Sequence, residues 1–142
     1  MASNAGSAVA APFLDTNVLL YLLSDDAAKA DRCEALLAEG ATVGVQVLNE
    51  FASVARRKLV MEWVEIEDVL GLIRTRCEVK DLTATVHDRA LKLAARHLLS
   101  WYDALIVAAA AEAGSRLLYS EDMQHGLKIG GALTIRNPFL SA

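Results

Sequence analysis

The sequence predicts an α/β domain of three layers, α/β/α, with a central, mostly parallel sheet of four to five strands. Short apolar segments alternate with longer segments whose apolar residues recur at helical spacing. Strands that alternate with helices favour a parallel sheet covered by helices on both faces. The length of 142 residues fits one compact domain. We therefore expect a single domain over residues 1–142, with residues 1–10 as a flexible tail.

The chain's first predicted strand is a short apolar run over residues 11–14, which ends at Asp15. A short helix is expected to follow it and to continue to residue 23. Thr16 and Asn17 can cap the start of that helix, because both have side chains that accept hydrogen bonds from free backbone amides.

The next segment carries apolar side chains at helical spacing over residues 27–39 and stops at Gly40, a typical helix end. Residues 41–45 form the second strand candidate. An amphipathic helix is then predicted over residues 46–58, with Glu50 in its first turn or so.

The second half of the chain continues this alternation. Amphipathic helices are predicted over residues 64–75 and 83–97, and residues 100–113 are apolar almost throughout, which predicts a buried central helix. The remaining strand candidates are the short apolar segments 78–82, 116–119 and 132–135.

Four acidic residues lie far apart in the chain, each at the edge of an apolar segment: Asp15, Glu50, Asp103 and Asp122. Two of them follow predicted strands and two lie near the start of predicted helices. Ligand sites in parallel sheets form outside the carboxyl ends of the strands, so one rim of the sheet could collect all four. Clustered carboxylates repel one another, and a divalent ion such as Mg²⁺ or Mn²⁺ is the usual way to hold them together.

Each acid also has a purely structural explanation. Asp15 could cap a helix, Ser100 and Asp103 have the spacing of a capping box, Glu50 could favour the positive end of its helix, and Asp122 could be a turn residue. Together, these explanations leave open why three hydrophobic elements present an acid at the same end. No Ser/His/Asp or Cys/His set that would supply a protein nucleophile is evident.

Charge and cysteine content narrow the function classes. The formal net charge of −4 excludes a protein that binds long stretches of nucleic acid without specificity. It does not exclude an enzyme that contacts one strand locally. Cys33 and Cys77 lack metal-type spacing, which favours buried thiols in a reducing compartment. The first residues lack the features of a signal peptide. We therefore expect a cytoplasmic protein.

The ordered set of motifs resembles the PIN-domain family, especially the VapC-type toxins of toxin–antitoxin pairs. The acids are separated by 35, 53 and 19 residues, and the resemblance covers roughly residues 12–140. The matching motifs are Phe13-Leu14-Asp15-Thr16-Asn17, Val47-Leu48-Asn49-Glu50-Phe51, Asp103-Ala104-Leu105-Ile106-Val107, Leu118-Tyr119-Ser120-Glu121-Asp122 and Asn137-Pro138-Phe139.

This resemblance implies which residues act. The metal-binding and catalytic acids would be Asp15, Glu50, Asp103 and Asp122. The supporting residues would be Thr16, Asn17, Ser120 and Glu121. Independently of the resemblance, the basic run Arg56, Arg57 and Lys58 is either a solvated helix end or a phosphate contact beside the site.

The resemblance also implies an activity and partners. The expected activity is Mg²⁺-dependent (or Mn²⁺-dependent) endoribonuclease hydrolysis of RNA phosphodiester bonds, by the toxin of a type II toxin–antitoxin system. Expected partners are the RNA substrate, a second copy in a homodimer, and a cognate antitoxin whose C-terminal segment lies over the active site. Helices 27–39 and 46–58 are the candidates for the groove that binds the antitoxin. Two alternatives remain open: a housekeeping RNA-processing nuclease, and a non-catalytic PIN-like binding protein.

Overall fold

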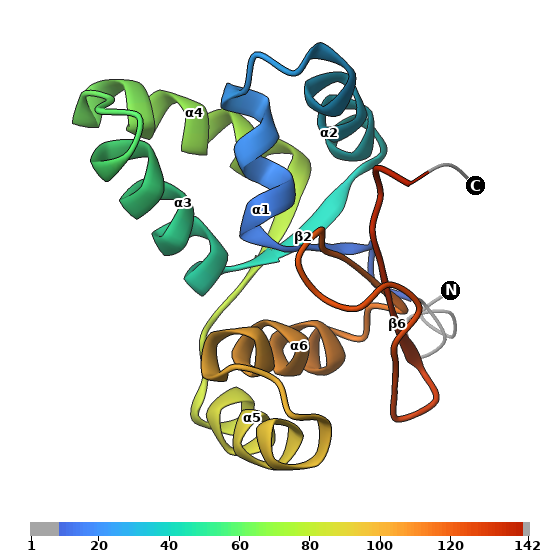
Figure 1. Cartoon of the computed structure of the whole chain (residues 1–142). Coiled ribbons are helices and arrows are strands. Elements are labelled where there is room, and N and C mark those ends of the chain that lie inside the picture. Colours follow the sequence, from blue (N-terminus) through green and yellow to red (C-terminus); the bar gives the residue numbers. More distant parts are fainter. Residues whose placement is uncertain (1–8, 141–142) are drawn as a thin grey trace, which may run out of the picture.

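The protein folds into three layers, with a central sheet between two layers of helices (Figure 1). The structure, a computed structural model, describes residues 9–140. A flexible tail was expected over residues 1–10. Residues 1–8 of it lie outside the described residues. Beyond that point, Ala10 forms an isolated parallel bridge with Ser115.

The sheet within residues 9–140 has six strands in the order β3-β2-β1-β4-β6-β5. The first five in that order pair in parallel, and β5 pairs antiparallel with β6 at the edge. The sequence predicted four to five strands, and β5 is too short for an alternating pattern to reveal it. The strands are β1 (Phe13–Leu14), β2 (Ala41–Gly44), β3 (Cys77–Lys80), β4 (Leu117–Tyr119), β5 (Lys128–Ile129) and β6 (Leu133–Arg136).

The helices divide between the two faces of the sheet, as Figure 1 shows. One face is covered by α1 (Thr16–Leu19), the 3₁₀ helix η2 (Leu20–Leu23), α2 (Ala27–Glu39), α3 (Val45–Arg57) and α4 (Trp63–Arg76). The other face is covered by α6 (Trp101–Ala113), with α5 (Ala84–His97) outside it. The segment expected as one helix to residue 23 tightens into a 3₁₀ helix after Leu19.

The order of the strands creates the point at which a site can form. From β1 the chain moves outward through β2 to β3, then crosses under the sheet through α5 and α6 and returns to β4 on the other side of β1. The strand order therefore reverses between β1 and β4. Ligands of open parallel sheets bind in the crevice outside the carboxyl ends at such a reversal.

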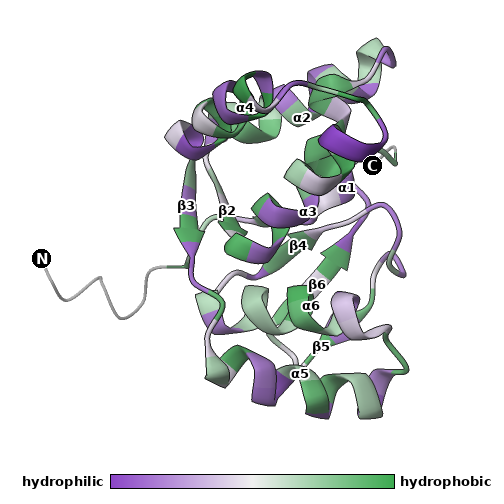
Figure 2. Ribbon diagram, turned by 90° about the vertical axis from the view of Figure 1, so that its left-hand side faces the viewer, coloured by the Kyte–Doolittle hydropathy of each residue, from purple (hydrophilic) through white to green (hydrophobic). Residues whose placement is uncertain are grey.

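The core holds these carboxyl ends rigidly. Phe13, Leu14 and Leu118 of the two neighbouring strands are fully buried. Figure 2 shows α6 as mostly hydrophobic, lying between the sheet and the outer helix α5, whose surface is mixed. Gly44 ends β2 and begins α3, and a Cβ atom there would lie 3.3 Å from Cζ of Phe13. The lack of a side chain at Gly44 thus lets α3 start directly beside β1.

None of the helices in residues 9–140 is long and apolar enough to cross a membrane.

Candidate functional site

Asp15 lies at the carboxyl end of β1 and is the N-cap of α1, as its structural explanation predicted, whereas Thr16 and Asn17, which were also expected to cap this helix, lie inside it. Its Oδ1 accepts a hydrogen bond of 2.7 Å from the backbone amide of Thr16. Its Oδ2 accepts from the hydroxyl of Ser120 at 2.8 Å and from the side-chain amide of Asn17 at 3.2 Å. Asp15 is only 4% exposed, so these bonds replace most of the water that an ionised carboxylate needs.

Ser120 and Asn17 join the ends of β1 and β4. The buried Ser120 hydroxyl accepts from the backbone amide of Met123 at 3.3 Å and from the amide of Asn17 at 3.4 Å, while it donates to Asp15. Oδ1 of Asn17 accepts from the backbone amide of Glu121 at 3.0 Å. The segment that follows β4 is therefore fastened to α1 by side chains of both elements.

Glu50 approaches from the second turn of α3, just beyond the first turn or so in which it was expected. Its Oε1 accepts from the hydroxyl of Thr16 at 2.7 Å, and its Oε2 accepts from the amide of Gln46 at 3.4 Å. Two neutral donors thus orient this carboxylate without neutralising its charge.

One open cavity of about 350 Å³ collects these groups at the β1–β4 reversal. Asp103 reaches it from the first turn of α6, where the Ser100 hydroxyl caps the Asp103 amide at 3.2 Å. Asp122 reaches it from the segment after β4. The residues lining the cavity are Asp15, Thr16, Asn17, Leu20, Glu50, Ser53, Val54, Arg57, Asp103, Ile106 and Asp122.

The electrostatics of the cavity act most strongly on Asp15. Burial raises the pKa of this carboxyl from 3.8 to about 6, against the lowering effect of its bonds from Ser120 and Thr16. The negative charges of Asp103 and Glu50 make a smaller contribution to this raised pKa. Ionised Asp15 therefore destabilises the ion-free site, and a bound cation would offset this loss of stability.

Hard carboxylate oxygens in a polar cavity fit a hard divalent cation such as Mg²⁺ or Mn²⁺. Within the described part of the chain, however, no three acidic, histidine or cysteine side chains are grouped closely enough to hold one ion together. Mg²⁺ keeps several of its waters and takes few protein carboxylates. The donor set therefore fits an ion held by one or two acids directly, with water between the ion and the others.

The family model of the PIN domain matches residues 13–126, which span both strands of the site and all four acids. The chain belongs to the PIN domain family. PIN domains are nucleases as a family. No curated protein is significantly similar to the chain in sequence.

Solved structures resemble this PIN domain over most of its length. A toxin–antitoxin complex from Klebsiella pneumoniae aligns with a TM-score of 0.68 and 17% identity, covering 90% of this chain and 98% of the other. VapBC2 from Rickettsia felis, bound to a promoter DNA fragment, aligns at 0.65 and 19%, covering 88% and 96%. VapC20 of Mycobacterium tuberculosis, a toxin that cleaves the sarcin–ricin loop, aligns at 0.63 and 20%, covering 78% and 88%. These similarities show the fold.

Some residues proposed from the sequence lie elsewhere in this PIN domain. The side chain of Glu121 points to Tyr21 and Lys29 and does not line the cavity. Arg56 donates to the carbonyl of Met61 at 2.9 Å and so belongs to the turn between α3 and α4. Of the basic run Arg56, Arg57 and Lys58, Arg57 alone lines the cavity.

Sequence reasoning also missed contributors to the site. Ser53 lines the cavity and its hydroxyl accepts from Nε of Arg57 at 3.0 Å. The spacing of Glu50, Ser53 and Arg57 along one helix face could have revealed this, because residues three and four apart are neighbours. Tyr21 and Lys29 carry no such signal, since the residue that they contact lies about a hundred positions away.

Proposed function

We propose that this PIN domain is a divalent-metal-dependent endoribonuclease. The observation that carries the proposal is the convergence of four acids, from four separate elements, on one cavity at the reversal of strand order. Asp15, Glu50, Asp103 and Asp122 would hold the metal. The ion, when bound, supplies an activated water and neutralises charge on the phosphate.

The chain's own residues prepare the site for this chemistry. Ser120 and Asn17 hold the Asp15 carboxylate in a fixed rotamer, and Thr16 holds Glu50. Because these donors are neutral hydroxyl and amide groups, they orient the acids and leave their negative charge available for a cation. Loss of such an outer partner typically lowers metal affinity about 10- to 100-fold.

Arg57 would bind the substrate. Its guanidinium lines the cavity one turn beyond Ser53 on α3, at the exposed mouth of an otherwise acidic site. An arginine in that place matches a phosphate geometrically and offsets the repulsion between the acids and the RNA backbone. With a net charge of −4, the chain attracts phosphate weakly overall, so selection by RNA shape and unpaired bases is expected.

We further propose that the chain is the toxin of a toxin–antitoxin pair, acts in the cytoplasm and forms a homodimer. The similarity to toxin–antitoxin complexes supports the role, although a housekeeping nuclease would share the same site. Light scattering that finds monomer alone at micromolar concentration would contradict the dimer.

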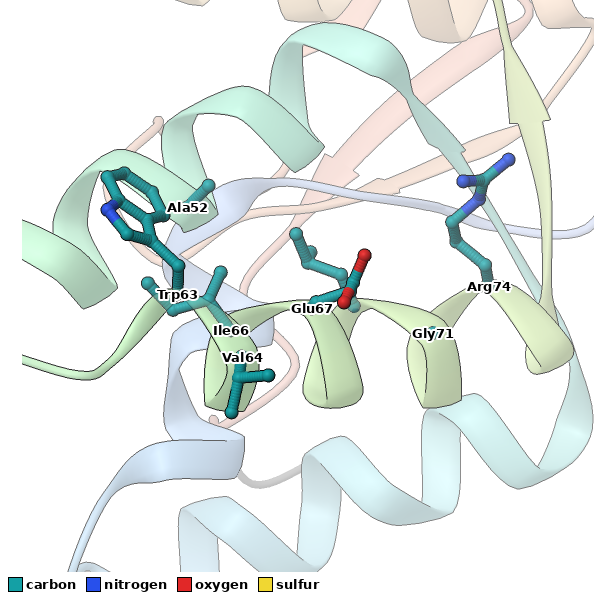
Figure 3. Close-up of a pocket in the computed structure, with 8 residues that line it drawn as sticks. Ala52, Trp63, Val64, Ile66, Glu67, Gly71 and Arg74 are labelled. Carbon is teal, nitrogen blue, oxygen red and sulfur yellow. The ribbon is translucent and has the colours of Figure 1, made fainter.

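The antitoxin surface is proposed along α4. A cavity of about 600 Å³ lies between α3 and α4, where Figure 3 shows Trp63, Ile66 and Arg74 with Ala52 of α3. A second cavity of about 450 Å³ lies on the other side of α4, against α2 and η2. Trp63 and Leu72 on α4 are 62% and 69% exposed. Exposed apolar side chains beside two hollows are typical of a protein interface.

The test of the activity is to map RNA ends after brief induction of the wild-type chain and of Asp15→Asn. We expect a few dominant cuts that disappear in the variant. Cleavage in vitro should require Mg²⁺ or Mn²⁺ and stop with a chelator. A wild-type chain that neither cleaves RNA nor is stabilised by metal in thermal melts would contradict the proposal and favour the non-catalytic alternative.

A further inference from the structure

Glu121 lies next to Asp122, but its carboxylate makes a separate set of contacts. Its Oε1 accepts a hydrogen bond of 2.6 Å from the hydroxyl of Tyr21, and its Oε2 forms an ion pair with Lys29. The ammonium of Lys29 also donates to the hydroxyl of Tyr21 at 3.1 Å. These three side chains come from η2, α2 and the segment after β4, and we call them the Glu121 clamp.

Two aromatic rings pack against the Lys29 ammonium of the Glu121 clamp. The ring of Phe139 packs edge-on against Tyr21 at 4.9 Å between centroids, and the ammonium of Lys29 lies 4.6 Å from the Tyr21 centroid and 5.2 Å from that of Phe139. The side chains of Lys29 and Glu121 are 31% and 24% exposed. The pair is therefore partly exposed, and its role depends on the network of hydrogen bonds and aromatic contacts rather than on burial.

The charges of the clamp are mutually stabilised. Burial alone would raise the pKa of Glu121, but the hydrogen bonds from Lys29 and Tyr21 outweigh burial and hold this pKa below its ordinary value. The bond to Glu121 in turn raises the pKa of Lys29. Both carboxylate oxygens of Glu121 are engaged, one by Tyr21 and the other by Lys29, so Glu121 is committed to the clamp.

Asp122 depends on its neighbours for its position. It is exposed and, within residues 9–140, its carboxylate forms no hydrogen bond of its own. The segment that carries it is fixed on one side by the Ser120 hydroxyl bonded to Asp15 and by the Glu121 amide bonded to Asn17. The Ser120 amide also donates to the carbonyl of Arg136, and the side chain of Met123 is buried in the core. The Glu121 clamp is the attachment that fastens the segment to η2 and α2.

We propose that Glu121 is a positioning residue, which with Lys29 and Tyr21 holds the segment after β4 so that Asp122 faces the metal-binding cavity. Glu121 is thus neither a metal ligand nor a substitute for Asp122. This inference rests on the proposed metal-dependent function of the cavity.

The test measures Mn²⁺ affinity of the purified full chain, without RNA, by electron paramagnetic resonance. Glu121→Gln and Lys29→Met should each weaken Mn²⁺ binding about tenfold, the lower end of the range for loss of a partner that orients a metal ligand. The paired exchange of Lys29→Glu with Glu121→Lys should recover part of the affinity, because the ion pair is restored with reversed sign. A lost metal ligand would show no such recovery.

The matched control is the ion pair between Arg89 and Glu112, which joins α5 and α6 on the other face of the sheet. Glu112→Gln removes an equivalent interaction and should leave Mn²⁺ affinity unchanged. Hydrogen–deuterium exchange on the metal-free chain supplies a second measurement. Amides of residues 120–123 should exchange faster in Glu121→Gln and as in wild type in Glu112→Gln.

Each outcome decides between the alternatives. Wild-type affinity and exchange in Glu121→Gln would overturn the positioning role while leaving the metal site intact. Loss of affinity equal to that of Asp122→Asn, with no recovery in the paired exchange, would make Glu121 a ligand and also overturn the proposal. A wild-type chain that binds no Mn²⁺ would overturn the proposed function itself, and this inference with it.

Discussion

The hydroxyl of Thr16 donates a hydrogen bond of 2.7 Å to Oε1 of Glu50, and so joins the start of α1 to the second turn of α3. Thr16 is also the residue whose backbone amide is capped by Asp15. Thr16 therefore contacts two of the acids, Asp15 at the end of β1 and Glu50 on α3, and couples their orientations. The metal-binding geometry that we propose depends on this link as much as on the acids.

The first prediction concerns Thr16. Thr16→Val keeps the volume of the side chain but removes the donor, leaving Glu50 with the weaker contact from Gln46 at 3.4 Å. We expect RNA cleavage to fall about 10- to 100-fold, the usual effect of losing a partner that orients a metal ligand. Thr16→Ser retains the hydroxyl and should keep most of the activity. Equal loss in both variants, measured by single-turnover cleavage, would assign the effect to packing.

The second prediction is a pH dependence of stability set by Asp15. Well below pH 3.8 this carboxyl is protonated in both the folded and the unfolded chain, and its titration does not affect stability. Its folded pKa of about 6 exceeds the ordinary 3.8, so between these values the unfolded chain loses the proton first and stability falls as pH rises. Above pH 6 the full cost applies, at most about 3 kcal/mol for a difference of about 2 pKa units.

Asp15→Asn removes this titration, so the free energy of unfolding of the variant relative to wild type should increase from pH 4 to pH 7.5. Denaturant melts at several pH values in metal-free buffer measure the difference. The change with pH is the decisive quantity, because the amide also loses an acceptor for Thr16, Ser120 or Asn17 at every pH. Mn²⁺ should stabilise wild type and not the variant. A difference that is constant with pH would contradict the raised pKa.

The fold could be predicted closely from the sequence because its elements carry strong local signals. Residues 27–39 have helical periodicity and a terminal glycine, and the predicted and observed helix bounds coincide. The helix α6 was predicted because its residues are apolar almost throughout. The strand β5 was missed because two residues are too few to show alternation.

The site was less predictable than the fold. The positions of the acids follow from the rule that ligands gather at the carboxyl ends of parallel strands, and the cavity contains all four. The direction of a side chain does not follow from that rule. Glu121 was grouped with the supporting residues by its place beside Asp122, whereas the ammonium of Lys29 draws its carboxylate toward α2. Such long-range pairs leave no trace in a single sequence.

The third prediction concerns substrate binding by Arg57. Arg57→Gln should raise KM for RNA about tenfold with little change in kcat, because a phosphate contact contributes equally to the ground state and the transition state, and a tenfold change corresponds to about 1.4 kcal/mol. Lys58→Gln is the matched control, since Lys58 follows on the same helix end and does not line the cavity. A fall in kcat without a change in KM for Arg57→Gln would point to a role in the chemical step.

The last prediction tests the partner surface along α4. Leu72 is 69% exposed, lines the cavity between α2 and α4, and is an apolar side chain that a partner helix or strand could bury. Leu72→Asp should weaken binding of the antitoxin encoded beside the chain's gene by at least about tenfold, since burying an unpaired charge costs several kcal/mol. The variant should retain RNA cleavage and the wild-type melting temperature, because Leu72 lies outside both the core and the acidic cavity.

Leu91→Asp provides the matched control: Leu91 is a 53% exposed leucine on α5, on the opposite face of the sheet. Titration calorimetry with the purified antitoxin distinguishes the two faces. If Leu91→Asp weakens binding and Leu72→Asp does not, the antitoxin binds the α5 layer, and the surface along α4 is free for a second copy of the chain.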